Sequence, residues 1–373
     1  MTADRELTES QRRWLRVREH LGRNRHPLAL RAFDDFDLAP RIGDAPLLVR
    51  PEWLPAGPVP LADVQLDYQP DTPFDGLTGT GDVASDVLPL RPDGTAYARY
   101  SEALADLAAP ASLHNLPTYR LLSAELHDEP RLVFGAGYYF DGLDTGEASA
   151  HEYAGVDLGE MQTLTLRTAI GDPTDLARRP VNVAVSALTL RHDRATGETT
   201  MPLHHRDATK VGHAGGMIQV LPVGIFQPAG PEPWNVTHDL SLWRLLLREY
   251  AEELLGAGED YDTTKAPLDY DAWPFGAQMT AALDAGRSRP YVLGMGVDPL
   301  TFATDILAAV VFDAGTYDEL FAAAVADNAE GTVLPAVAFT EDQVDRYAGH
   351  EPTQAAGAAL LRLAWHHRRT LLG

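Results

Sequence analysis

The sequence predicts a mixed α/β fold in which helices cover both faces of a mixed sheet. Between residues 180 and 373 the apolar pattern runs as strand, hairpin, strand, long helix, further strands and closing helices. With 45% hydrophobic and 23% charged residues, the composition is that of a globular protein. The 373 residues suffice for one large domain or two ordinary ones.

The first 165 residues are expected to form a proline-rich α+β region that packs on the remainder of the chain. Trp14, Val17 and Leu21 recur at helical spacing, so residues 5–25 are predicted to form a basic amphipathic helix. Prolines and glycines are dense from residue 27 to residue 92, which indicates loops with short extended segments. No linker composition follows, and we divide the chain into an N-terminal accessory region, 1–165, and a domain, 166–373.

Charge and the N-terminal sequence limit the partners that the chain is expected to bind. A formal net charge of −24 argues against a broad nucleic-acid surface and against binding to an anionic membrane surface. The chain has no cysteine, which excludes disulfides, thiolate catalysis and cysteine-based zinc sites. The N-terminus lacks the pattern of a signal peptide, and no apolar run reaches about 18 residues. A cytoplasmic protein is expected.

A long helix between Asp239 and Gly256 is the central element of the predicted domain. Asp239 suits an N-cap and Gly256 a left-handed C-terminal turn. Three carboxylates, Glu249, Glu252 and Glu253, stand at i, i+3 and i+4 and project from one patch of its surface. A hard divalent cation would remove their repulsion. The alternative is a solvated helix face, on which Arg248 pairs with Glu252.

The run from Arg248 to Glu253, Arg-Glu-Tyr-Ala-Glu-Glu, resembles the second half of the Nudix box. In that family the three glutamates hold the catalytic metal ions, so the resemblance implies Glu249, Glu252 and Glu253 as catalytic and metal-binding residues. Upstream, Leu221-Pro222-Val223-Gly224 resembles the strand end that opens the same box. The resemblance also implies a Nudix-like α/β/α sandwich for residues 166–373.

Two departures from the box mark the domain as divergent. About ten residues are inserted between Gly224 and Arg248, and the glutamate of the first half of the box has no counterpart at its expected position. The wider chain resembles a group of actinobacterial proteins that share the Arg-Glu-x-x-Glu-Glu-Leu-Leu-Gly run, some of which are linked to helix-turn-helix regulators.

Further candidate residues lie outside the helix. His205, Arg206 and Lys210 precede a glycine pair and are expected, with Arg248, to bind substrate anions; an ordinary polar strand end is the alternative. In the family a further metal-binding carboxylate commonly lies on a downstream loop. Asp298 is the first candidate for it, followed by Glu232 and Asp305.

The leading hypothesis is a Nudix-type hydrolase that uses Mg²⁺ or Mn²⁺ to act on a nucleoside-diphosphate-linked or similar phosphorylated small molecule. A non-catalytic sensor of such a ligand is the second hypothesis. A third is an enzyme of specialised metabolism that uses the Nudix scaffold for other chemistry. A homodimer is expected from the prevalence of two-fold oligomers.

Overall fold

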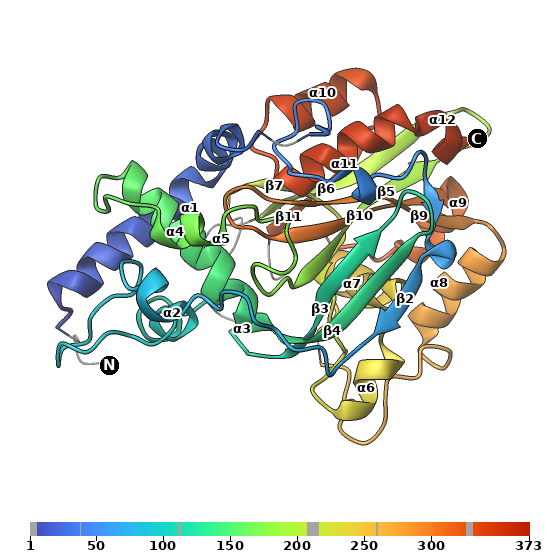
Figure 1. Cartoon of the computed structure of the whole chain (residues 1–373). Coiled ribbons are helices and arrows are strands. Elements are labelled where there is room, and N and C mark those ends of the chain that lie inside the picture. Colours follow the sequence, from blue (N-terminus) through green and yellow to red (C-terminus); the bar gives the residue numbers. More distant parts are fainter. Residues whose placement is uncertain (1–5, 38, 111–112, 207–215, 259, 326–330) are drawn as a thin grey trace.

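The computed structural model describes residues 6–37, 39–110, 113–206, 216–258, 260–325 and 331–373. Its fold is mixed α/β, which confirms the predicted class: a large mixed sheet carries helices on both faces, and a smaller sheet packs beside it (Figure 1).

The large sheet has eight strands among the described residues. They are β1 (Val59–Pro60), β5 (Val183–His192), β6 (Thr199–Arg206), β7 (Ile218–Val220), β8 (Val223–Ile225), β9 (Ser288–Val297), β10 (Thr304–Asp313) and β11 (Gly331–Ala338). The main path runs β1-β9-β10-β5-β6-β11, with β7 paired to β6 and β8 to β5. The β5–β10 pair is parallel and the other pairs are antiparallel.

Strand β10 is buried on both faces, and its residues divide between two hydrophobic clusters. Ile306, Ala308 and Val310 belong to one cluster, whereas Leu307 and Ala309 belong to the other. Because successive side chains of a strand point to opposite faces, this division places one cluster on each side of the sheet.

Helices cover both of these clusters. On one face lie α10 (Glu341–Gly349), α11 (Ala355–His366) and α12 (Arg368–Leu372). On the other lie α7 (Leu242–Leu255), α8 (Pro274–Asp284) and α9 (Ala314–Leu320), preceded in the chain by the short α6 (Pro233–His238). Across the described ranges, no helix combines the length and apolar character that crossing a membrane would require.

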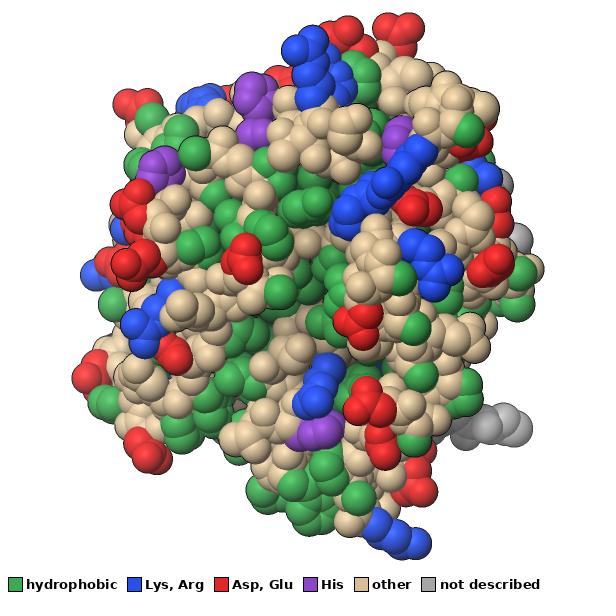
Figure 2. All heavy atoms as spheres, turned by 90° about the vertical axis from the view of Figure 1, so that its right-hand side faces the viewer, with side chains coloured by type: hydrophobic (Ala, Val, Ile, Leu, Met, Phe, Trp, Pro, Cys, Tyr) green, Lys and Arg blue, Asp and Glu red, His purple; other side chains and the backbone are tan. Residues whose placement is uncertain are grey.

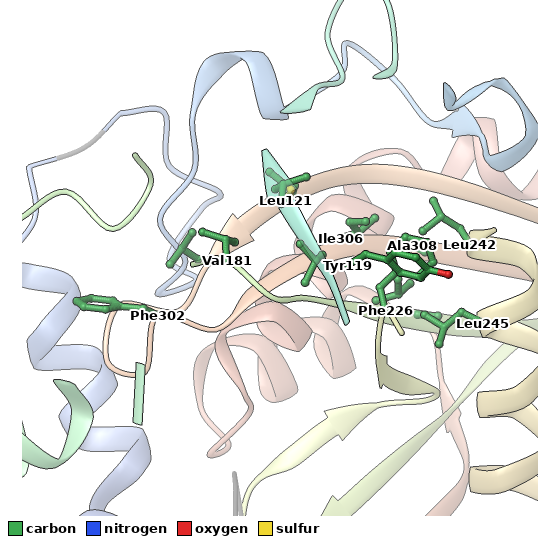
Figure 3. Close-up of a cluster of buried hydrophobic side chains, with 14 of the residues drawn as sticks. Tyr119, Leu121, Val181, Phe226, Leu242, Leu245, Phe302, Ile306 and Ala308 are labelled. Atoms are coloured by element: carbon green, nitrogen blue, oxygen red, sulfur yellow. The ribbon is translucent and has the colours of Figure 1, made fainter. Parts of the chain in front are cut away.

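The smaller sheet consists of β2 (Gln65–Tyr68), β4 (Arg131–Tyr138) and β3 (Pro117–Glu125), in that order. Two backbone hydrogen bonds attach β3 to segments of the domain: Leu121 N–H donates to Val181 O (2.8 Å) and Tyr119 N–H to Phe226 O (3.2 Å). Beside them the Tyr119 and Phe226 rings pack against each other at a tilt of 43°, with centroids 4.5 Å apart (Figure 3). The two sheets therefore share one hydrophobic cluster.

The N-terminal region supplies α1 (Glu9–Asp34), α2 (Tyr100–Leu107), α3 (Tyr139–Gly142), α4 (Ala148–Asp157) and α5 (Thr165–Ile170). Helix α1 begins at a Thr8 capping box and ends later than predicted, because it continues past a kink at Asn24. The same region contributes β1 to the large sheet, and Leu48 forms a bridge to Val297. The N-terminal segment thus packs on the domain, while a domain boundary at residue 165 stays a prediction.

Truncation of Phe226 tests the junction between the sheets. Phe226 is fully buried between the Tyr119 and Phe134 rings, so Phe226→Ala should lower the free energy of unfolding by about 3–5 kcal/mol, measured by urea denaturation. Leu116→Ala, at a side chain that is 38% exposed, is the control and should change it by about 0.5 kcal/mol or less. Equal losses in the two variants would contradict a shared core at Phe226.

Candidate functional site

Helix α7 carries the three glutamates and runs from Leu242 to Leu255. Its C-terminal residue is followed by Gly256 at φ +67°, the left-handed turn that the sequence predicts. The predicted N-cap is wrong by two residues: the Ser241 side chain caps the helix by accepting from Arg244 N–H. Asp239 is instead fully buried, and its carboxylate accepts from Ala229 N–H (2.8 Å) and from the Tyr270 hydroxyl (2.9 Å).

The buried face of α7 fixes the rotation of the helix. Leu245, Leu246 and Leu254 are at most 1% exposed in the cluster under the sheet. Tyr250 lies among them, and its hydroxyl is 2.8 Å from Thr189 Oγ1 on β5. With this face held against the sheet, the directions of the glutamate side chains follow from their spacing.

Glu253 reaches back to the end of the neighbouring strand. Its Oε1 accepts a hydrogen bond of 2.7 Å from Val223 N–H, at the start of β8. Its Oε2 lies 4.0 Å from Nδ1 of His204, a buried residue of β6. Glu253 is therefore a buried carboxylate that connects α7 to two strands of the large sheet.

Glu249 packs directly against the backbone of Gly224, the next residue of β8. A Cβ on Gly224 would overlap the carboxyl group of Glu249, so any larger residue there would have to displace that group. Glu249 is half-buried. The two segments that resemble the halves of the Nudix box are thus in contact through Glu249 and Glu253.

Glu252 lies beside a tyrosine that the sequence did not single out. The Tyr261 hydroxyl donates to Glu252 Oε1 at 2.7 Å. Burial, and then the negative charges of Glu252 and Glu249, raise the pKa of the Tyr261 phenol. The phenol is thus a neutral hydrogen-bond donor within electrostatic reach of both carboxylates.

Arg248 is buried, in contrast to the substrate-binding position expected for it. It donates to the Tyr270 hydroxyl and to Gln227 O (2.6 Å), and it lies 3.7 Å from Asp239. Burial disfavours the charged form, but Tyr270 and Asp239 outweigh that effect and the pKa of Arg248 is raised. This placement does not support a substrate contact; Arg248 holds the residues inserted before α7.

The basic end of β6 divides between the two faces of the sheet. Met201 and Leu203 face the α11 side, so His205, which continues their alternation, is directed away from the glutamates. The opposite alternation places His204 and Arg206 on the α7 side, where Arg206 donates to Gln219 Oε1 (2.9 Å). Lys210 lies outside the described residues. His204, which the sequence analysis passed over, could have been found from this alternation.

The predicted further carboxylate does not join the glutamates. Asp298 follows β9, which β10 and β5 separate from β8, and its Oδ1 accepts from Leu300 N–H (2.9 Å) and Thr301 N–H (2.7 Å) to hold a turn. Glu232 accepts from Asn235 and Thr263 beside α6. Within the ranges that the structure describes, no three His, Asp or Glu side chains are arranged to hold a metal ion. Metal binding by Glu249, Glu252, Glu253 and Asp298 stays a prediction.

Comparison with known proteins adds little to this geometry. No protein-family model matches the chain, and no curated protein is detectably similar to it in sequence. Among solved structures, a similarity is found to a crystal structure of a NUDIX hydrolase from Alicyclobacillus acidocaldarius, with 17% identity and a TM-score of 0.26 over 49% of this chain and 90% of that chain. A TM-score this low supports no inference, so what the site can do follows from the chain's own residues.

Asp305, the last of the carboxylate candidates, is expected to make stability depend on pH. Burial raises its pKa to about 6, although Ser186 Oγ donates to it at 2.8 Å. The folded state therefore holds this proton more tightly than the unfolded state, and stability should fall by about 3 kcal/mol as pH rises from about 4 to about 6.

Unfolding of wild type and Asp305→Asn across this pH range checks that expectation. The variant should lose this part of the pH dependence, whereas Asp284→Asn, at the exposed end of α8, should retain it. An unchanged pH profile in Asp305→Asn would show that Asp305 is ionised throughout.

The contact between Glu253 and β8 can be tested by two substitutions. Glu253→Ala removes the acceptor of a part-buried backbone N–H and should cost about 1–3 kcal/mol of unfolding free energy. Glu253→Gln retains a side-chain oxygen at that position and should lose less. Chemical denaturation measures both, and equal losses would mean that the hydrogen bond to Val223 contributes nothing.

Proposed function

We propose that the chain is a Nudix-type hydrolase that acts on a small phosphorylated molecule with Mg²⁺ or Mn²⁺. One observation carries the proposal: the Arg-Glu-x-x-Glu-Glu segment of α7 contacts Val223 and Gly224 through two of its glutamates. The sequence analysis assigned these two segments to the two halves of one motif, although about ten inserted residues separate them. The packing of α7 brings them together despite that insertion.

The donor set of the site fits a hard divalent cation. Glu249 and Glu252 are half-buried carboxylates at i and i+3 of one helix, and the negative charges of both raise the pKa of the Tyr261 phenol. Mg²⁺ commonly takes one or two protein carboxylates and completes its shell with phosphate and water. Glu249 and Glu252 would hold the ion, and Glu253 would position Glu249 through its bond to the strand end.

A bound divalent ion would neutralise charge on phosphoryl oxygens and lower the pKa of an attacking water. The protein's own residues supply the remainder of the site. Tyr261 orients Glu252, and the buried Arg248 holds the inserted residues against α7. Arg206, on the same side of the sheet as His204, is the residue that we assign to a substrate phosphate.

Binding of a phosphorylated ligand without turnover is the second candidate function. It is favoured by the hydrogen bonds that Glu252 and Glu253 form with Tyr261 and Val223. Carboxylates that serve the fold in this way can persist in a protein that senses a ligand. Hydrolysis of the bound ligand would distinguish the first candidate from the second.

Titration with Mn²⁺ or Mg²⁺ by calorimetry tests the proposal on wild type and on Glu249→Gln/Glu252→Gln. The wild type should bind, and the variant should bind at least about tenfold more weakly, because amides are poor ligands for hard cations. Glu319→Gln/Glu341→Gln removes the same charge from exposed helix positions and should bind as the wild type does.

A further variant, Gly224→Ala, keeps every carboxylate but forces Glu249 away from the strand end. It should also weaken ion binding, and a screen of nucleoside-diphosphate compounds should show ion-dependent hydrolysis by wild type alone. Absence of ion binding up to millimolar concentration would refute the metal site. Ion and ligand binding without hydrolysis would favour the sensor.

A further inference from the structure

The net charge of this chain attracts divalent cations but does not choose between them. The formal charge is −24, and acidic side chains are scattered over the face seen in Figure 2, which views the molecule from the right-hand side of Figure 1. Because Mg²⁺ and Ca²⁺ carry the same charge, this field attracts both. A preference between the two ions has to come from the way in which the protein holds its carboxylate oxygens.

One oxygen of Glu252 is engaged by a neighbouring side chain. The Tyr261 hydroxyl donates to Glu252 Oε1 at 2.7 Å, and it lies 3.4 Å from Arg248 O, one turn earlier in α7. The phenol therefore lies over the turn of the helix from which Glu252 projects. Hydrogen bonds to an ionised carboxylate are among the stronger ones in proteins, so this bond orients Glu252.

Aromatic packing holds the Tyr261 ring in place. The rings of Tyr261 and Trp273 meet edge to face with centroids 5.6 Å apart. Trp273 meets Phe275, in the first turn of α8, in the same way and at the same centroid distance. The phenol thus belongs to an aromatic group that extends from α7 to α8.

The residues inserted before α7 hold the chain close to this phenol. Two residues after Tyr261, the Thr263 hydroxyl donates to Glu232 Oε2 (3.0 Å), and Trp234 Nε1 donates to Thr263 O (3.1 Å). Trp234 lies in α6, and Glu232 is the N-cap residue of that helix. The segment that departs from the Nudix box therefore supports the tyrosine that contacts Glu252.

The carboxyl group of Glu249 is also restricted. It occupies the position that a Cβ on Gly224 would take, so it lies against the backbone of β8. The two carboxylates to which we assign the ion are thus held from opposite directions, Glu249 by a strand and Glu252 by a phenol. Neither can turn without breaking a contact.

The two ions require different ligands from such a pair. Ca²⁺ takes about six to eight oxygens and accepts both oxygens of one carboxylate, whereas Mg²⁺ takes about six in a strict octahedron and commonly uses one or two carboxylates with water. While Tyr261 bonds to Oε1, Glu252 can offer an ion at most its other oxygen. A carboxylate that binds through one oxygen suits Mg²⁺ and removes a ligand from Ca²⁺.

We propose that Tyr261 is a specificity-determining residue of this site, because its hydrogen bond restricts Glu252 to one oxygen and so selects Mg²⁺ over Ca²⁺. The inference rests on the proposed function, since it requires a divalent ion at Glu249 and Glu252. It also assigns a role to the inserted residues, which hold Tyr261 in place through Thr263.

Calorimetric titration of wild type and Tyr261→Phe with Mg²⁺ and with Ca²⁺ tests the inference. Wild type should bind Mg²⁺ at least as tightly as Ca²⁺. Tyr261→Phe keeps the ring against Trp273 and removes only the donor. Ca²⁺ then no longer displaces a hydrogen bond to a charged group, so it should bind the variant at least about tenfold more tightly than it binds wild type. The affinity for Mg²⁺ should change by about threefold or less, because Glu252 still offers one oxygen.

Tyr317→Phe is the matched control, because it removes the same atom from a half-buried ring of α9 and should keep the wild-type preference. An unchanged ratio of the two affinities in Tyr261→Phe would overturn the inference and leave the proposed function standing. A wild type that binds Ca²⁺ more tightly than Mg²⁺ would also overturn it, without the use of any variant. Absence of binding of either ion to wild type up to millimolar concentration would overturn both the inference and the proposed function.

Discussion

The close approach of α7 to the start of β8 is the constraint on which the candidate site depends. A helix carrying Glu249 can meet the strand this closely only because Gly224 has no side chain there. Glu253 then bonds to Val223 N–H, one residue earlier in the same strand. Since Tyr250 and the leucines of the opposite face hold α7 under the sheet, these two glutamates have little freedom to turn elsewhere.

The residues inserted before α7 are compatible with this contact because Arg248 contacts the inserted segment near its start and near its end. Its guanidinium binds Gln227 O near the start of the inserted residues and lies beside Asp239 near their end. A buried ion pair of this kind is strongly destabilising when one partner is removed, although the intact pair adds little stability. The arginine of the Arg-Glu-x-x-Glu-Glu run thus positions the loop, while the glutamates that follow it form the site.

Much of the fold could be predicted from the sequence, because α7 has a strong helical apolar period, β10 is a continuous apolar run and Gly256 marks a helix end. The errors arose where tertiary contacts, rather than local sequence, decide the role of a side chain. Asp239 is as good an N-cap by type as Ser241, but its burial against Tyr270 gives it another role. His205 was preferred to His204 although only the strand's register decides which faces α7. Asp298 could be excluded only once β10 and β5 were known to separate it from β8.

Arginines hold segments of the fold together in this chain, which has a formal charge of −24. All but two of its 30 Lys and Arg residues are arginines, whose planar fork can join two acceptors at once, as a lysine ammonium does not. Arg25 binds both oxygens of Glu147 and so joins α1 to the start of α4, and Arg167 binds the carbonyls of Pro299 and Leu300. Guanidinium groups used in this way hold segments together and offer nothing to a ligand. Arg289 is used in the same way: it shares the Asp313 carboxylate with Arg194, as Arg25 shares Glu147 with Arg18.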